Sequence, residues 1–275
     1  MDFMETDKPD LCKYRQSSVY LADLISWYKD QECSMRSLAK KLNVSPALLS
    51  LVTNGKRALT EENIDVWAPV FKWNAQEVSW LKQIILIEHS SVGQKKTAME
   101  NLSRFKSYNE NYPQEVLTFK YLKKWWNVAI REMSELPGFQ EDGEWIQQKL
   151  LFSVSINEIR KSLKFLNKHK LLASYGSLRR LNCQGDVYKL SLSEFHAQIL
   201  DKAVESIYKV SSEERYILGQ TLAIDSKKFP EAKAILEEAL EKIVKLGDQE
   251  KNPSDVYQFS FIGFPLTRMK EGTSK

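Results

Sequence analysis

The sequence has little of the residues that build metal centres and disulfide frameworks. Of its 275 residues, only three are cysteine and three are histidine. Cys12, Cys33 and Cys183 lie far apart and form no C-x-x-C pair, which argues against a zinc site and indicates a reducing cytoplasm. None of the histidines has a second ligand at metal-binding spacing. We therefore expect no metal and no cofactor.

Long hydrophobic runs are also missing. The longest aliphatic stretch, "QIILIE", is far too short to span a bilayer. The first ten residues, "MDFMETDKPD", are acidic rather than apolar and do not resemble a secretory signal. These two absences predict a cytoplasmic protein with no membrane partner.

Motifs typical of enzymes do not occur either. The chain has no glycine-rich phosphate loop, no nucleophile elbow and no paired-histidine metal motif. Its 36 acidic residues form no constellation that distinguishes catalytic carboxylates from solvated helix faces. The stretch "KWWNVAIRE" could suggest aromatic stacking on single strands, but Trp125, Ala129 and Ile130 have the spacing of a helix core, which is the interpretation we favour. We predict that the protein is not an enzyme.

The first 90 residues contain five helical patterns. Leu21, Leu24, Ile25 and Tyr28 follow the spacing of an amphipathic helix. The other four helices are expected to start after residues that cap helix N-termini: Ser34, Ser45, Thr60 and Asn74. These patterns predict one compact five-helix domain over residues 1–92.

The rest of the chain predicts a more mixed structure, so the expected fold class is mainly α with a smaller α/β part. Residues 93–113 are polar, end in proline and predict a linker. Residues 114–192 read as helix, helix and β-hairpin, the order of a winged helix, with strands at 171–172 and 187–192. Residues 193–275 read as helix, strand, helix, strand, with the strands in "YILGQTLAID" and "DVYQFSFIGFPLT". These two strands could pair in parallel through a right-handed crossover, and the last one, apolar on both faces, should be central. This C-terminal region could serve dimerisation or sensing.

The modest net charge of +4 is distributed unevenly. Residues 34–60 contain five basic and no acidic residues, and residues 155–190 contain eight basic and two acidic ones. From Ser193 onward, 12 basic residues face 14 acidic ones. Lysines could merely solvate exposed helix faces, but two basic clusters on helix-turn-helix patterns favour phosphate binding.

The stretch "SMRSLAKKLNVSPALLSLVTNGKRALT" resembles the helix-turn-helix of the lambda-repressor-like regulators. The resemblance implies that Ala39 lies where two helices cross, that Leu49 and Val52 pack inward, and that Pro46, Ala47, Ser50 and Leu51 face a DNA groove. Double-stranded DNA is thus the expected partner, and the candidate contacts are Arg36, Lys40, Lys41, Ser45, Ala47, Ser50, Lys56 and Arg57.

Base readout from this helix is expected to be weak. Arginine, asparagine and glutamine supply the usual bidentate contacts to bases, and the helix interior has none of them. Ala47, Leu48 and Leu51 could touch thymine methyl groups, and Ser50 could bond to a base or a phosphate. A second set of phosphate contacts is expected on the winged-helix candidate, from Arg160, Lys161, Lys164, Arg179 and Arg180.

A protein-interaction function, in place of DNA binding, also stays open. The helix-turn-helix could be a degenerate scaffold whose exposed Leu48 and Leu51 bind another protein and not DNA.

The whole chain also resembles an uncharacterised bacterial family, expanded in predatory bacteria, whose members are presumed transcriptional regulators. The pieces that carry the resemblance include "KWWNVAIREM", "EERYILGQTLAI" and "DVYQFSFIGFPLT". It implies a DNA-binding regulator of transcription. We expect a homodimer, because such domains usually reach two half-sites as two-fold pairs.

Overall fold

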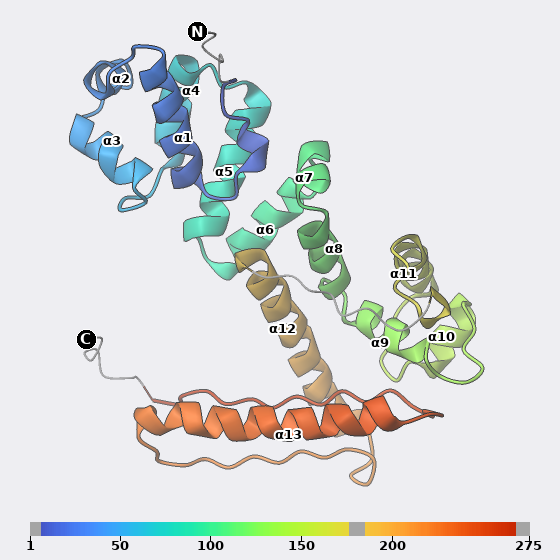
Figure 1. Ribbon diagram of the computed structural model, residues 1–275. Coiled ribbons are helices and arrows are strands. Elements are labelled where there is room, and N and C mark those ends of the chain that lie inside the picture. The colour runs from blue at the N-terminus through green and yellow to red at the C-terminus, as the bar shows by residue number, and fades with distance from the viewer. Residues whose placement is uncertain (1–6, 176–184, 268–275) are drawn as a thin grey trace. The chain divides into compact units, whose positions relative to one another are not determined.

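The computed structural model describes residues 7–175 and 185–267, and every regular element in these two ranges is a helix (Figure 1). The first part holds η1 (Leu11–Lys13), α1 (Ser17–Asp30), α2 (Met35–Lys41), α3 (Pro46–Thr53), α4 (Glu61–Phe71) and α5 (Ala75–His89). Then follow α6 (Val92–Leu102), α7 (Lys106–Asn111), α8 (Pro113–Leu122), α9 (Trp125–Met133), α10 (Gly143–Lys149), α11 (Ile156–Lys168) and η2 (Ala173–Tyr175). The last elements are α12 (Asp186–Lys209), η3 (Ser226–Lys228) and α13 (Phe229–Gln249).

The helices of the first 90 residues start where their capping residues predict. The Oγ of Ser34 accepts the amide of Ser37, and the Oγ of Ser45 accepts the amide of Leu48. Thr60 caps α4 in the same way, and Asn74 forms a complete capping box with Glu77 at the start of α5. Each cap satisfies a helix-terminal N–H that would otherwise lack a partner. The five helices expected in this region are therefore confirmed.

The chain divides into two compact units, and each is described by itself. Unit 1 comprises residues 1–123 and 181–196, and unit 2 comprises residues 124–180 and 197–275. The core of unit 1 is rich in aromatic rings. Tyr20, Trp67, Phe71 and Trp80 are almost fully buried, and the Nε1 of Trp73 donates a hydrogen bond to the Oη of Tyr20 at 2.8 Å. This core fixes α1, α4 and α5 against one another, and α3 packs on α1.

Residues 93–113 are part of unit 1 and not an isolated linker. They form α7 and most of α6, which packs along α5. Met99, Leu102 and Tyr108 are buried in the core, and the Oη of Tyr108 donates to the buried carboxylate of Glu115 at 2.8 Å. The polar composition that suggested a linker belongs to the solvent-facing sides of these helices.

The predicted winged helix is wrong for the part of the chain that the structure describes. Residues 171–172 are buried but belong to no strand, and residues 187–192 lie in the first turns of α12. Val187 and Leu190 point into unit 1 at helical spacing. The remainder of the expected hairpin falls on residues 176–184, outside the described residues.

The helices of unit 2 do form the core expected of "KWWNVAIREM". Trp125 and Ile130 of α9 are buried, together with Ile146 of α10 and Ile159 of α11. The Nε1 of Trp126 donates to the Oγ of Ser162 at 3.0 Å, which ties α9 to α11. These tryptophans are structural, in agreement with the core interpretation.

The predicted α/β arrangement of the C-terminal region is also wrong as stated. The first C-terminal segment, residues 215–225, and the second C-terminal segment, residues 253–265, have no helical structure and are not paired as strands. Between them lies α13, a helix of 21 residues in which no side chain is buried. The described residues therefore form an all-α protein, and the two apolar segments have no sheet partner among them.

Candidate nucleic-acid interface

The helix-turn-helix is built from α2, a tight turn and α3. In the turn, Asn43 adopts the left-handed conformation with φ 54°, and the amide of Val44 donates to the carbonyl of Ala39 at 3.0 Å. Ala39 is fully buried, so a larger side chain would push the two helices apart. Leu49 and Val52 are buried in the core of unit 1 and hold α3 in place. These contacts determine which face of α3 points outward.

The outward face of α3 is short and mostly apolar. Ala47 is exposed, and Leu51 is 41% exposed. Ser50 is half-buried, and its Oγ accepts the Nδ2 of Asn54 at 3.3 Å, which leaves the hydroxyl proton available to a ligand. Leu48, by contrast, is half-buried and packs against the core. Of the two leucines in the alternative interface, only Leu51 is well exposed.

The loop after α3 places two cations beside this face. Gly55 has φ +67°, a conformation that L side chains rarely adopt. The amides of Lys56 and Arg57 both donate to the carbonyl of Leu51, at 2.9 and 3.1 Å. The basic loop is thus fixed to the C-terminal end of α3, and both side chains extend into solvent.

Five cations surround α2 and α3, and we call them the basic lobe: Arg36, Lys40, Lys41, Lys56 and Arg57. All five are exposed. Within the described residues none of them has an acidic partner within 4.0 Å, whereas Lys233 and Lys242 of α13 are each paired with a glutamate of the same helix. Unpaired cations keep their full charge for a phosphate, because no competing ion pair must first be broken.

The start of α3 adds a favourable dipole. Ser45 is exposed and caps the helix by accepting the amide of Leu48, and Pro46 occupies the first turn. The positive end of the helix dipole is therefore exposed to solvent, four residues after Lys41 in the sequence. An anion is stabilised at such a helix N-terminus.

The second set of predicted contacts is less complete. Arg160, Lys161 and Lys164 are exposed on α11, but the Nη2 of Arg160 pairs with the Oε1 of Glu144 at 2.6 Å. Arg179 and Arg180 lie outside the described residues. This cluster belongs to unit 2, whereas the basic lobe belongs to unit 1. We therefore describe the basic lobe as the candidate site.

The sequence analysis did not single out Asn54 as a contact residue. In the structure its exposed amide lies one helical turn from Ser50 and shares a hydrogen bond with it. Asparagine is one of the residue types that read bases, and Asn54 places such a side chain at the C-terminal end of α3. The i, i+4 spacing of Ser50 and Asn54 in the sequence could have predicted that these two side chains lie together on one face of the helix.

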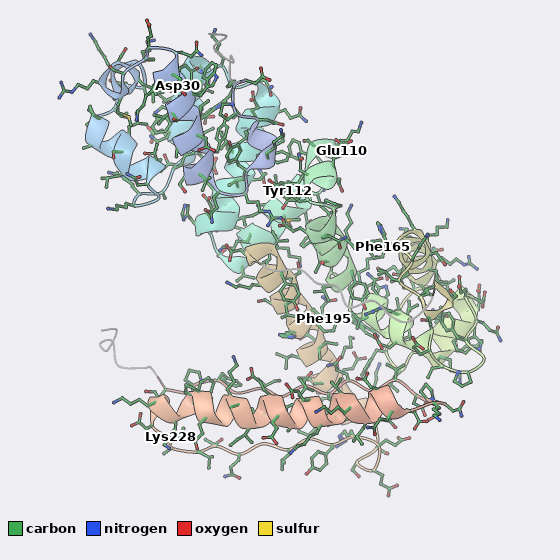
Figure 2. All side chains as sticks on the ribbon, viewed as in Figure 1. Asp30, Glu110, Tyr112, Phe165, Phe195 and Lys228 are labelled. Atoms are coloured by element: carbon green, nitrogen blue, oxygen red, sulfur yellow. The ribbon has the colours of Figure 1, made fainter. Side chains whose placement is uncertain are left out.

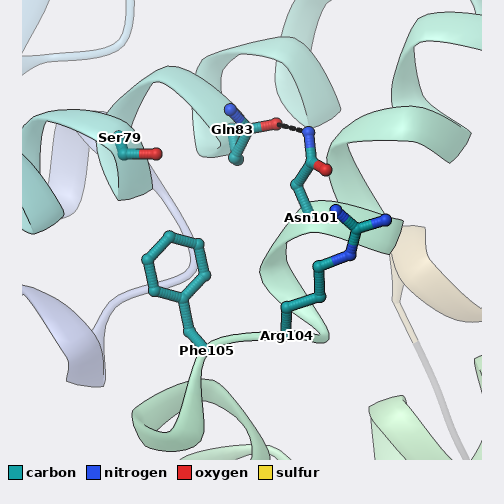
Figure 3. A pocket seen from close by; sticks show the side chains of 5 residues that line it. All are labelled: Ser79, Gln83, Asn101, Arg104 and Phe105. Carbon is teal, nitrogen blue, oxygen red and sulfur yellow. Dashed lines mark hydrogen bonds between the residues drawn. The ribbon is translucent and has the colours of Figure 1, made fainter.

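One shallow pocket of unit 1 was also not foreseen. It lies between α5 and the end of α6, opens widely to solvent, and is lined by Ser79, Gln83, Asn101, Arg104 and Phe105 (Figure 3). The Nδ2 of Asn101 donates to the Oε1 of Gln83 at 3.1 Å across one side of it. This bond occupies the Oε1 of Gln83 and one N–H of Asn101, and Arg104 is the one charged side chain that lines the pocket.

Two general features complete the description. In residues 7–175 and 185–267, no helix combines the length and hydropathy needed to cross a membrane. Over the same ranges, no group of three or more His, Cys, Asp or Glu side chains could hold a metal ion.

The fold and site define an all-helical protein, over the described residues, that carries a basic helix-turn-helix. The chain belongs to the family of the domain of unknown function DUF4423, whose model matches residues 94–266. That match covers α6 to α13 almost completely and leaves the helix-turn-helix outside it. No curated protein and no solved structure is significantly similar to the chain. The function of the basic lobe must therefore be argued from its own residues.

Proposed function

We propose that the protein binds double-stranded DNA through the basic lobe and acts as a non-enzymatic regulator of transcription. The observation that carries the proposal is the set of five exposed cations around α2 and α3, with no acidic residue between positions 34 and 60. Phosphate contacts of this kind supply most of the affinity of non-specific DNA binding.

The proposed binding has low sequence discrimination. Ala47 and Leu51 offer only apolar contacts to thymine methyl groups, Ser50 offers one hydroxyl, and the amide of Asn54 lies at the very end of the helix, where its Nδ2 bonds to the Oγ of Ser50. A bidentate contact discriminates against the wrong base by about 1–3 kcal/mol, and the outward face of α3 has no side chain placed in its centre that could make one. Affinity should therefore depend on charge far more than on base sequence.

The proposal is tested by fluorescence anisotropy with a random-sequence duplex at several salt concentrations. Five phosphate contacts predict a slope of log affinity against log salt of about −4.5, since each contributes roughly 0.9. A double variant, Lys56→Ala with Arg57→Ala, should lose much of the binding. Absence of binding at low salt would overturn the proposal.

A protein-docking role for the same face has weaker support. Leu51 is exposed, but Leu48 packs partly against the core of unit 1, so the apolar area available to a partner is small. The cations around it would form a charged border that suits phosphates better than an apolar partner.

A further inference from the structure

The C-terminal region holds most of the exposed apolar surface of the protein. Of the 27 large apolar side chains that are exposed in the described residues, 18 lie between Tyr216 and Leu266. Tyr216, Leu218 and Leu266 are each more than 70% exposed. Monomeric proteins rarely expose an apolar surface of this extent, and it usually marks an interface.

The helix in this region has an apolar stripe of which no residue is buried. Its apolar residues recur at i, i+3, i+4, i+7, i+8 and i+11: Ala232, Ile235, Leu236, Ala239, Leu240 and Ile243. None of them is buried, and Figure 2 shows side chains extending from all around the helix that follows Lys228. A stripe of this kind is stable only when it packs against another layer.

The two C-terminal segments run along this helix without pairing with each other. Both run in the same direction, one on each side of α13 in the view of Figure 1. The second segment returns to the start of the helix, where a Cβ on Gly263 would lie 3.5 Å from the ring of Phe229. Neither segment pairs as a strand within the described residues, so the apolar composition of both is left without a covering layer.

We infer that a second copy of this chain covers the apolar surface of the C-terminal region. Each copy offers the apolar stripe of α13 together with the two segments, and residues 253–265 are apolar on both faces. A two-fold axis lets this surface of each copy cover the same surface of the other.

Area and charge both support a second copy as the occupant. Aromatic side chains bury roughly 150–250 Å² each, so 18 apolar side chains exceed the about 800 Å² per partner of a standard interface and reach the range of obligate dimers. From Ser193 onward, acidic and basic residues are nearly balanced, which does not favour nucleic acid or an anionic membrane. Isologous contacts of this type close on themselves, so a two-fold pair leaves no copy of the surface unmatched.

The first experiment measures the mass of the full chain by light scattering during size-exclusion chromatography. We expect twice the 31.9 kDa of one chain at micromolar concentration. Phe259→Asp should shift the mass to that of a monomer, whereas Ser254→Asp, an exposed polar position before the apolar residues begin, should leave the dimer intact. A monomeric wild-type chain would overturn the inference.

The second experiment needs no destabilising variant. Single cysteines are placed in a chain whose own three cysteines are replaced by serine. A symmetric disulfide requires Cα atoms about 4.4–6.8 Å apart, so at least one of Gln258→Cys, Ser260→Cys, Gln220→Cys and Thr221→Cys should give a disulfide-linked dimer under mild oxidation. Absence of a cross-link at all four positions would overturn the inference.

This inference does not rest on DNA binding, and the two can fail separately. A dimer that ignores DNA contradicts only the proposed function. A monomer that binds DNA with a steep salt dependence contradicts only the C-terminal dimer.

Discussion

The backbone amide of Lys56 donates a hydrogen bond of 2.9 Å to the carbonyl oxygen of Leu51, and that oxygen also accepts the amide of Arg57. One carbonyl at the end of α3 thus fixes the position of two cations relative to the outward face of the helix. In a complex with DNA, an α3 that lies in the groove would bring both side chains to the phosphates beside it.

Removing these two cations should reduce the salt dependence of binding. Lys56→Ala with Arg57→Ala is expected to make the slope of log affinity against log salt shallower by about two units, since each lost phosphate contact removes about one. Lys106→Ala is the control, because Lys106 is exposed on α7 of the same unit and has only the weak pairing with Glu110. Equal slopes for the double variant and the wild type would remove both residues from the interface.

Gly55→Ala tests whether the shape of the loop matters in addition to its charge. A side chain at φ +67° costs about 1–2 kcal/mol, so the free energy of unfolding should fall by that amount. DNA affinity should fall as well, because the loop can relieve the strain by moving Lys56 and Arg57. Gly93→Ala is the matched control: it lies in α6, has nothing within 4 Å of the added Cβ, and should stabilise by about 0.5–1 kcal/mol. Chemical denaturation and anisotropy together separate the two effects.

Leu51→Ser distinguishes DNA binding from protein docking. Leu51 is well exposed, so its replacement should change the free energy of unfolding by less than about 0.5 kcal/mol, and phosphate-driven DNA binding should persist. Leu49→Ala, a change to the fully buried neighbour, should cost about 2–5 kcal/mol. If Leu51→Ser abolished DNA binding without a loss of stability, α3 would contribute more to affinity than its few polar groups suggest.

The N-terminal segment should be held to α1 in a pH-dependent way. Burial, and then the hydrogen bond that Tyr14 donates to Asp23 at 2.8 Å, raise the pKa of Tyr14 from 10.0 to about 12. A raised pKa means that the folded state favours the neutral phenol. Its contribution to stability is present in full below pH 10 and is lost as the pH rises through about 12.

Ultraviolet titration of tyrosinate absorbance checks this expectation. Tyr14→Phe should remove one group that ionises near pH 12 and leave the earlier part of the titration unchanged. The pKa values of Tyr20 and Tyr108 are raised too, chiefly by burial, so these two phenols should ionise only as the chain unfolds. If the variant instead lost absorbance near pH 10, Tyr14 would not be held by Asp23.

The helices near the N-terminus could be predicted because their signals are local. Ser34, Ser45 and Asn74 each bond to amides within three residues, so the sequence alone determines where α2, α3 and α5 begin. The burial of Ala39, Leu49 and Val52 followed from the helix-turn-helix pattern. The resulting exposure of the basic lobe could also be read from the sequence, because no acidic residue lies within it.

The predicted strands failed for two different reasons. Residues 187–192 carry a valine and two leucines in a short window, where helical and strand periodicity cannot be distinguished. The helical spacing becomes clear only over a longer stretch, because the buried positions continue to Phe195 and Ile199 of α12. The two C-terminal segments do have the composition of strands and are extended. A strand, however, needs hydrogen bonds from a neighbour, and the sequence of one chain does not show where that neighbour comes from.

Ala47 and Leu51 lie on the outward face of α3 and take no part in the core of unit 1. An asparagine, glutamine or arginine at either position would add a base-reading group without disturbing the packing of Leu49 or Val52. The five cations would still supply the attraction to the backbone. Under the proposed function, affinity and the choice of DNA sequence would rest on separate residues, and one or two substitutions could change the target while the fold and the phosphate contacts stay the same.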